Sequence, residues 1–114
     1  MDTIKHTDKL FEVTSEKYGK LLYFWCPGCG HCHSFEVPRW NFNGDFHAPT
    51  FSPSLRVFTR GWTDKESGEI IPERTVCHLF LEQGMIKYCG DSPHKLAGQN
   101  VPMEPIPSDY GGFI

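Results

Sequence analysis

Apolar and polar positions alternate with the period of a β-strand on both sides of Gln83-Gly84. Residues 75–82 and 85–89 flank this pair, and a glycine in a two-residue loop is typical of a hairpin. If those two residues form the loop, His78 lies directly opposite Cys89 and on the same face. The other face of the hairpin then holds Cys77, Leu79, Leu81, Ile86 and Tyr88.

The first half of the chain predicts shorter strands. Residues 21–25 are apolar on both faces, as expected of a buried strand, and residues 34–37 alternate as its partner. The turn between them carries two cysteines, which is the arrangement of a zinc-ribbon-like knuckle. Asn43-Gly44 predicts a hairpin turn, and residues 55–59 alternate as a further strand.

Two connections complete the pattern. Residues 61–72 are polar and contain two glycines, so we expect an exposed connection. Residues 91–98 begin with Asp91, Ser92 and Pro93 and end with Gly98, which favours one short helix. The fold class we expect is therefore small and β-rich, all-β or α+β, with a zinc-ribbon-like knuckle, β-hairpins and one short helix.

A chain of 114 residues is long enough for a single domain with one modest core. We expect the domain to span 1–114 with an ordered core over about 20–102. The N-terminal arm 1–19 shows no firm period and the C-terminal tail 103–114 is punctuated by prolines, so both are expected to be loose.

Charge and composition narrow the function. The net charge of −3 and the pI near 6.0 argue against a nucleic-acid partner. No apolar stretch is long enough to cross a membrane, and the polar N-terminus does not look like a secretory signal, so we expect a cytoplasmic protein. Thiols stay reduced there, and five cysteines cannot pair completely within one chain, which favours metal binding over disulfides.

Cys26-Pro-Gly-Cys29 is the strongest motif, because two thiolates separated by a tight turn can grip one zinc ion. Zinc needs further ligands, and His33, Cys77, His78 and His94 are the candidates. His31 and Cys32 are weaker candidates, since neighbours in an extended segment point to opposite faces. A thioredoxin-like dithiol is the competing interpretation, but such a site needs a helix starting at the motif.

His78, Asp91 and His94 are the candidates for catalysis. Together with Cys77 and Cys89 they occupy only 18 residues of the sequence. A histidine beside a carboxylate is either a metal ligand held by its neighbour or a general base oriented by an acid. The pattern leaves both interpretations open.

Several segments together resemble a family of small phage and prophage zinc-binding proteins of unknown function, often mislabelled "ammonia monooxygenase". The segments are Phe24-Trp-Cys-Pro-Gly-Cys-Gly, Trp40-Asn-Phe-Asn-Gly-Asp45, Pro49-Thr-Phe-Ser-Pro-Ser-Leu55, Cys77-His-Leu-Phe, Gly84-Met-Ile and Asp91-Ser-Pro-His-Lys-Leu-Ala-Gly-Gln99. The resemblance runs from about Tyr23 to Val101. It implies a compact β-rich viral protein acting in the host bacterial cytoplasm, with the family's pattern on Cys26, Cys29, His33, Cys77, His78, Asp91 and His94. Relatives carry a cysteine where this chain has Ser92, and nothing in the chain supports the monooxygenase label.

Two hypotheses follow. The first is a phage-encoded accessory protein with a structural zinc ion that interacts with a host protein, for example one of a defence system. The alternative is a metal-dependent hydrolase with Asp91 and His94 near an open zinc site. The sequence leaves open which four residues are ligands, whether one or two ions bind, and the oligomeric state.

Overall fold

The computed structural model describes residues 3–108 and contains only β-strands and connections over that range. The fold is small and all-β, built from antiparallel sheets, so the expected fold class is confirmed. No helix in the described part could cross a membrane.

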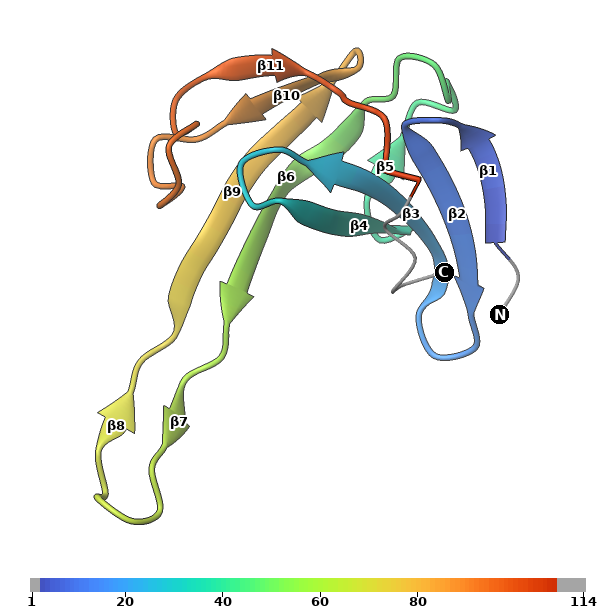
Figure 1. The fold of residues 1–114 in the computed structure, drawn as a ribbon. Helices are drawn as coiled ribbons and strands as arrows, with labels where there is room; N and C mark the ends of the chain where they lie inside the picture. Colours follow the sequence, from blue (N-terminus) through green and yellow to red (C-terminus); the bar gives the residue numbers. More distant parts are fainter. Residues whose placement is uncertain (1–2, 109–114) are drawn as a thin grey trace.

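The first sheet is a four-stranded meander in the order β1-β2-β3-β4 (Figure 1). Its strands are β1 (Thr3–Thr7), β2 (Leu10–Ser15), β3 (Gly19–Cys26) and β4 (His31–Val37). In β3 every second residue from Leu22 onward is buried, and Cys26 is the last of these inward residues. Strand alternation therefore carries the first cysteine of the knuckle into the interior.

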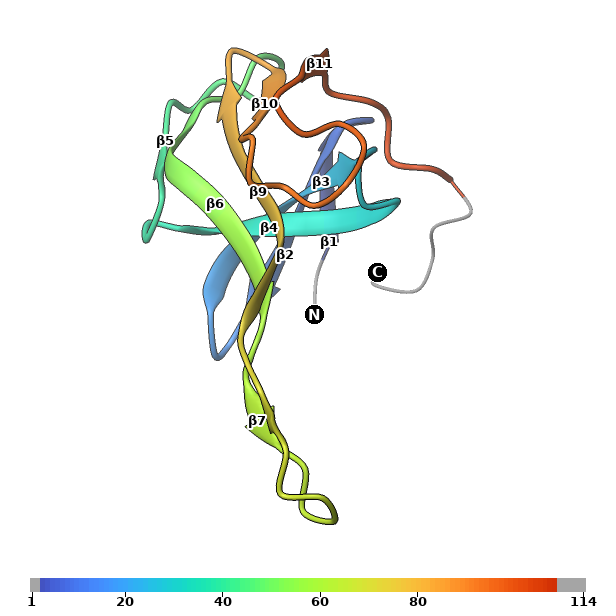
Figure 2. The same cartoon turned by 90° about the vertical axis from the view of Figure 1, so that its left-hand side faces the viewer.

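The second sheet has the order β11-β10-β9-β6-β5. Its strands are β5 (Asn41–Phe42), β6 (Phe51–Thr59), β9 (Arg74–Glu82), β10 (Met85–Tyr88) and β11 (Asn100–Pro102). Its long strands cross those of the first sheet in projection (Figure 2). The core lies between the two sheets, where Phe35 of β4 stacks on Phe51 of β6 with ring centroids 4.1 Å apart.

The hairpin of β9 and β10 has the register that the sequence predicts. Glu82 pairs with Met85, and the Gln83-Gly84 loop has positive φ at both residues, as a type I′ turn requires. One step past the end of β10, the Cys89 N–H donates to the His78 carbonyl at 2.9 Å. Cys77 faces inward with the four apolar residues expected on that face.

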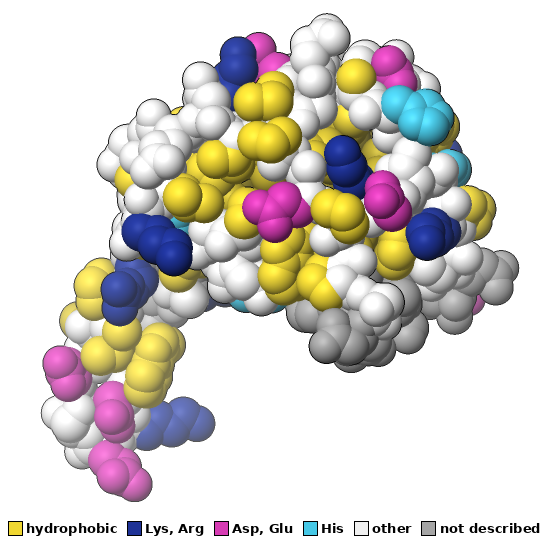
Figure 3. Space-filling view, turned by 45° about the horizontal axis from the view of Figure 1, so that its top comes forward, with side chains coloured by type: hydrophobic (Ala, Val, Ile, Leu, Met, Phe, Trp, Pro, Cys, Tyr) yellow, Lys and Arg dark blue, Asp and Glu magenta, His cyan; other side chains and the backbone are white. Residues whose placement is uncertain are grey.

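The expected connection at residues 61–72 is a projecting arm. It contains β7 (Trp62–Thr63) and β8 (Ile70–Ile71), which continue the lines of β6 and β9 away from the body (Figure 1). Trp62 is 57% exposed and Ile70 76% exposed, and Figure 3 shows hydrophobic side chains on the arm among charged ones.

Three local expectations differ from the structure. Residues 91–98 form successive turns, with hydrogen bonds such as Ala97 N–H to His94 C=O, because the segment is too short to offset helix nucleation. Residues before 20 form β1 and β2, and β2 buries Leu10 completely. Asn43-Gly44 begins a longer loop, since β5 pairs only with Phe51 and Ser52 of β6.

The expected loose tail is packed where it is described. Met103 and Ile106 are buried, and the Ile106 N–H donates to the Asp8 carbonyl at 2.8 Å. The rest of that tail, residues 109–114, lies outside the described residues.

Candidate active site and metal centre

Two clusters of reactive side chains lie on opposite faces of β9. Cys77 is fully buried and points into the core, whereas the next residue, His78, points to the outer face. Because strand side chains alternate, two adjacent residues can serve two separate sites.

The inner cluster contains three thiols and one imidazole. Cys26 of β3 and Cys77 of β9 come from facing sheets, and their sulfurs lie 3.9 Å apart. The turn after β3, closed by a hydrogen bond from Gly30 N–H to the Cys26 carbonyl, returns Cys29 to the same place. His94 approaches from the loop after β10, with its Nε2 3.4 Å from the Cys77 sulfur. One ligand atom from each of these four residues lies within 4.8 Å of the others.

Local packing fixes this arrangement. Gly28 permits it, because a Cβ at that position would collide with the imidazole of His94. The His94 ring also packs edge-on against Tyr88, with centroids 4.5 Å apart. The Tyr88 hydroxyl lies 3.0 Å from the Cys26 sulfur and accepts from the Gly28 N–H at 3.2 Å.

The three thiols of the inner cluster differ strongly in pKa. The hydrogen bond with Cys77, followed by the neighbouring His33 ring and the Tyr88 hydroxyl, lowers the pKa of Cys26 to about 3. Burial, followed by the nearby charge of Cys26, raises the pKa of Cys29 to about 11, and the hydrogen bond with Cys26 raises the pKa of Cys77. A site that holds one thiolate next to two protonated thiols is suited to a divalent cation, which stabilises all three as thiolates.

His33 lies beside this cluster. It is 6% exposed, and its Nε2 is buried without a hydrogen-bond partner in the described part of the chain. A buried polar atom without a partner is costly, and a thiolate at Cys26 would give the His33 ring a partner.

The outer cluster is a chain of hydrogen bonds between Ser54, His78 and Asp91. The Ser54 Oγ lies 3.0 Å from Nε2 of His78, and Nδ1 of the same ring lies 3.0 Å and 3.2 Å from the two carboxylate oxygens of Asp91. This order of hydroxyl, imidazole and carboxylate matches that of a Ser-His-Asp triad, in which the carboxylate orients the base and the base activates the hydroxyl. The His78 side chain is 25% exposed and that of Asp91 60% exposed, so the site is open to solvent.

A bulge in β6 places Ser54. Between the pairs Phe51–Leu81 and Leu55–Leu79, β6 contains three residues and β9 only one. Such irregularities re-aim a side chain and are frequent beside active sites. On the other side of the strand, the Ser54 carbonyl accepts a hydrogen bond from the Trp40 indole N–H at 3.2 Å.

Ser92 holds the backbone of the histidine. Its buried hydroxyl accepts from the His78 N–H at 2.9 Å and donates to the His78 carbonyl at 2.7 Å. Because Ser92 follows Asp91 directly, this double contact ties the carboxylate to the strand that carries the base. Cys89 also lies near His78 and Asp91, and burial raises the pKa of its thiol, with a smaller contribution from the Asp91 charge.

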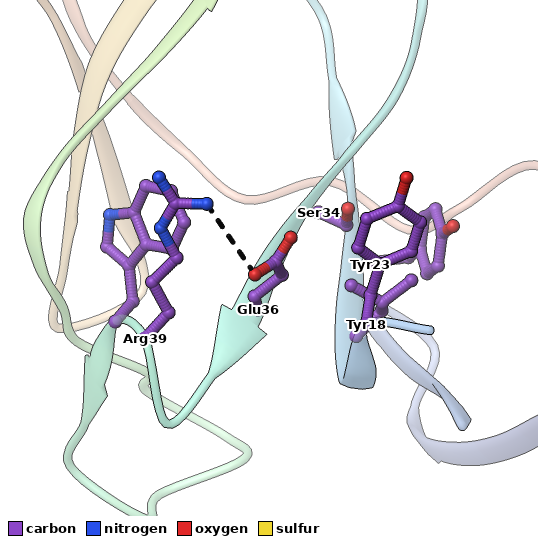
Figure 4. A pocket seen from close by; sticks show the side chains of 7 residues that line it. Tyr18, Tyr23, Ser34, Glu36 and Arg39 are labelled. Atoms are coloured by element: carbon purple, nitrogen blue, oxygen red, sulfur yellow. Dashed lines mark ion pairs between the residues drawn. The ribbon is translucent and has the colours of Figure 1, made fainter. Parts of the chain in front are cut away.

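A pocket opens beside Trp40, on the outer face of β3 and β4 (Figure 4). It has a volume of about 320 Å³, and Tyr18, Tyr23, Glu36 and Arg39 contribute to its walls. Glu36 and Arg39 form an ion pair at 3.8 Å across it. Since Trp40 both lines the pocket and binds the Ser54 carbonyl, the pocket is linked to the outer cluster through one side chain.

The structure divides the predicted site residues between the two clusters. Four of the six expected ligands come together in the inner cluster: Cys26, Cys29, Cys77 and His94. His33 lies beside it, and His78 belongs to the outer cluster with Asp91. Asp91 and His94, which the hydrolase hypothesis places near one open zinc site, belong to different clusters. Sequence reasoning missed Ser54, whose only signal is its place just before a predicted strand in a proline-bounded segment.

Comparison with known proteins identifies the family. Residues 2–89 match the family described as "Bacterial ubiquitination-like system serine protease (BubE)", and the chain therefore belongs to it. No curated protein and no solved structure matches the chain. This finding corrects the resemblance to phage and prophage proteins, and with it the expectation of a phage-encoded accessory protein that acts by binding a host protein. The alternative expectation of a hydrolase is closer to the family, which is one of proteases. The expectations of a host-protein partner and of no nucleic-acid partner stay predictions.

Proposed function

We propose that this member of the BubE family is a serine protease whose nucleophile is Ser54, whose general base is His78 and whose orienting carboxylate is Asp91. The observation that carries the proposal is the continuous hydrogen-bond chain from the Ser54 Oγ through both ring nitrogens of His78 to Asp91. The family's description supports the reaction class, and it points to a protein substrate of a bacterial ubiquitination-like system.

The geometry supports a two-step acyl transfer. Nε2 of His78 takes the proton of the Ser54 hydroxyl as the oxygen attacks the carbonyl carbon of the scissile bond. The same nitrogen then gives the proton to the departing amine, which leaves an ester on Ser54 that water hydrolyses with the same base. Asp91 accepts the Nδ1–H throughout, which keeps Nε2 in the form that can accept a proton and stabilises the ring when it is charged.

A fluorophosphonate probe tests this assignment, because it labels an activated serine without requiring a particular substrate. We expect labelling of Ser54, identified by mass spectrometry, and its loss in Ser54→Ala and His78→Ala. Ser52→Ala is the matched control, since Ser52 is an exposed serine two residues away on the same strand. Labelling that survives in Ser54→Ala would refute the proposal.

We propose in addition that Cys26, Cys29, Cys77 and His94 bind one structural zinc ion. Three sulfurs and one imidazole suit tetrahedral zinc, and four protein ligands leave no position open for a reacting water. The buried His33 ring, which helps to lower the pKa of Cys26, supports a charged centre there. Nδ1 of His94 accepts a hydrogen bond from the Leu96 N–H at 3.2 Å. Zinc at Nε2 requires the ring proton to be on Nδ1, so zinc binding would break this hydrogen bond.

Native mass spectrometry and a thermal melt test the metal centre. We expect one zinc ion per chain and its loss in Cys77→Ser and His94→Ala, with a lower melting temperature in both. Cys32→Ser is the control, because Cys32 lies close in sequence but outside the cluster. A zinc content that is unchanged in Cys77→Ser would refute this ligand set.

A further inference from the structure

The edge of β6 that faces away from β9 has a strand beside it for only two residues. Within residues 3–108, β5 pairs with Phe51 and Ser52, and no strand pairs with β6 on that side beyond them. Figure 2 shows β6 running on past β5. We call residues 54–59 on this side the free edge.

Ser54, the nucleophile proposed above, stands at the beginning of the free edge. Its carbonyl is directed to this side, because it accepts from the indole N–H of Trp40, the residue just before β5. In a strand the N–H and C=O groups of every second residue point to the same edge, so the backbone of Arg56 also faces this side. Arg56 lies opposite His78 in the register, but the His78 N–H bonds to Ser92 and the His78 carbonyl to Ser92 and Cys89. The backbone of Arg56 therefore has no hydrogen bond to His78, which agrees with its facing the free edge.

The side chain of Arg56 leaves the free edge uncovered. Its Nε donates to Thr75 and its Nη2 to Glu73, both at 2.8 Å, and its guanidinium lies over the Phe58 ring of the same strand. These contacts hold the side chain over the face of the sheet and toward β9. The unpaired backbone groups of an exposed strand edge can bind strands of other chains and cause aggregation. Proteins usually prevent this with charged residues, prolines or covering segments. An edge that stays accessible next to a reactive serine is consistent with use in binding.

We propose that the free edge of β6 is the substrate-binding edge of the protease, and that it binds an extended segment of the substrate as an added β-strand. This inference rests on the proposed function of Ser54. Main-chain hydrogen bonds to Arg56 and its neighbours hold the segment and bring its scissile bond to Ser54. At about 3.3 Å per residue, the free edge accommodates a segment of about five or six residues. The substrate is therefore cut in an extended linker or tail and not within a folded element.

The first test uses the unmodified protein and peptides from a digested bacterial lysate. A peptide that the protein cleaves is synthesised with one backbone N-methyl group at each position in turn, which removes one N–H at a time. We expect methyl groups at alternate positions to lower kcat/KM about tenfold or more, and those between them to have little effect, because only alternate N–H groups of an added strand face the enzyme. Equal tolerance at every position would overturn the proposal. So would a protein that is labelled at Ser54 by the fluorophosphonate but cleaves no peptide.

The second test changes the edge itself. Arg56→Pro removes the N–H directed to the free edge, whereas Arg56→Ala removes only the side chain and is the matched control. We expect both variants to be labelled at Ser54, and Arg56→Pro to cleave the peptide about tenfold more slowly than Arg56→Ala. Equal cleavage by the two labelled variants would overturn the proposal, and if Arg56→Pro does not fold, the N-methyl series decides.

The outcomes separate this inference from the proposed function. If the wild-type protein is not labelled at Ser54, the triad assignment fails and the binding edge fails with it. If labelling is normal but the N-methyl series is flat, only the binding edge fails. A wild-type dimer in light scattering that becomes monomeric in Arg56→Pro would assign the edge to a second copy of the chain and would also overturn the proposal.

Discussion

Replacement of Ser92 by alanine tests how the outer cluster is held together. The Ser92 hydroxyl makes two hydrogen bonds to the backbone of His78, and the side chain is 4% exposed. In Ser92→Ala the His78 N–H loses its acceptor, whereas the His78 carbonyl keeps the hydrogen bond from Cys89. Leaving one such donor unsatisfied costs about 1–3 kcal/mol, so we expect a loss of stability of about 2 kcal/mol.

Thermal melts and fluorophosphonate labelling measure the two consequences. A loss of about 2 kcal/mol corresponds to a fall in Tm of about 10 °C for a domain of this size. Labelling of Ser54 should slow as well, because Asp91 is tied to the strand of His78 through Ser92. Ser52→Ala, which removes an exposed hydroxyl, is the control and should change neither quantity. A Ser92→Ala protein with the wild-type Tm and labelling rate would refute the reasoning.

Four further predictions follow. Asp91→Asn should lower kcat by about 10²–10⁴ without changing the fold, and an unchanged kcat would remove Asp91 from the triad. Trp40→Phe keeps a ring but removes the donor to the Ser54 carbonyl, so labelling should slow while the Tm falls by only a few degrees, at about 1 kcal/mol for one hydrogen bond. Cys29→Ser should lose the zinc ion measured by native mass spectrometry, and retention would exclude Cys29 as a ligand. Burial, with a smaller effect of the Cys26 charge, raises the pKa of Cys32 from 9.0 to about 11. At pH 8, iodoacetamide should therefore alkylate Cys32 about 100-fold more slowly in the folded protein than in urea, and equal rates would contradict that pKa.

The hairpin of β9 and β10 could be predicted from the sequence because its information is local. The Gln83-Gly84 turn fixes the register, and the register alone places Cys77 inside and His78 outside. The proximity of His78 to Asp91 could be predicted for the same reason, since both residues lie near the base of that hairpin. The sequence could not decide between a ligand and a general base, because that choice depends on the third partner.

That third partner, Ser54, could not be predicted. Its position depends on the bulge in β6, and a bulge is set by how two strands that are distant in sequence pack against the same core. The metal centre lies between these cases. Cys26 and Cys29 are recognisable from spacing, and the choice of Cys77 over His78 follows from which face of β9 meets the opposite sheet. His94 reaches the cluster from a loop, whose path the local sequence does not fix.

Because Cys77 and His78 are adjacent and serve different sites, they limit where the chain tolerates insertions and deletions. Deleting or inserting one residue in β9 near these two would exchange the faces of the side chains beyond that point, so that a thiol would face solvent and an imidazole would enter the core. Both sites would fail in the same event. Insertions at the tip of the β7–β8 arm leave the pairing of β9 with β6 and β10 untouched. The chain can therefore vary in length at its arm, while the strand that serves both sites must keep its length.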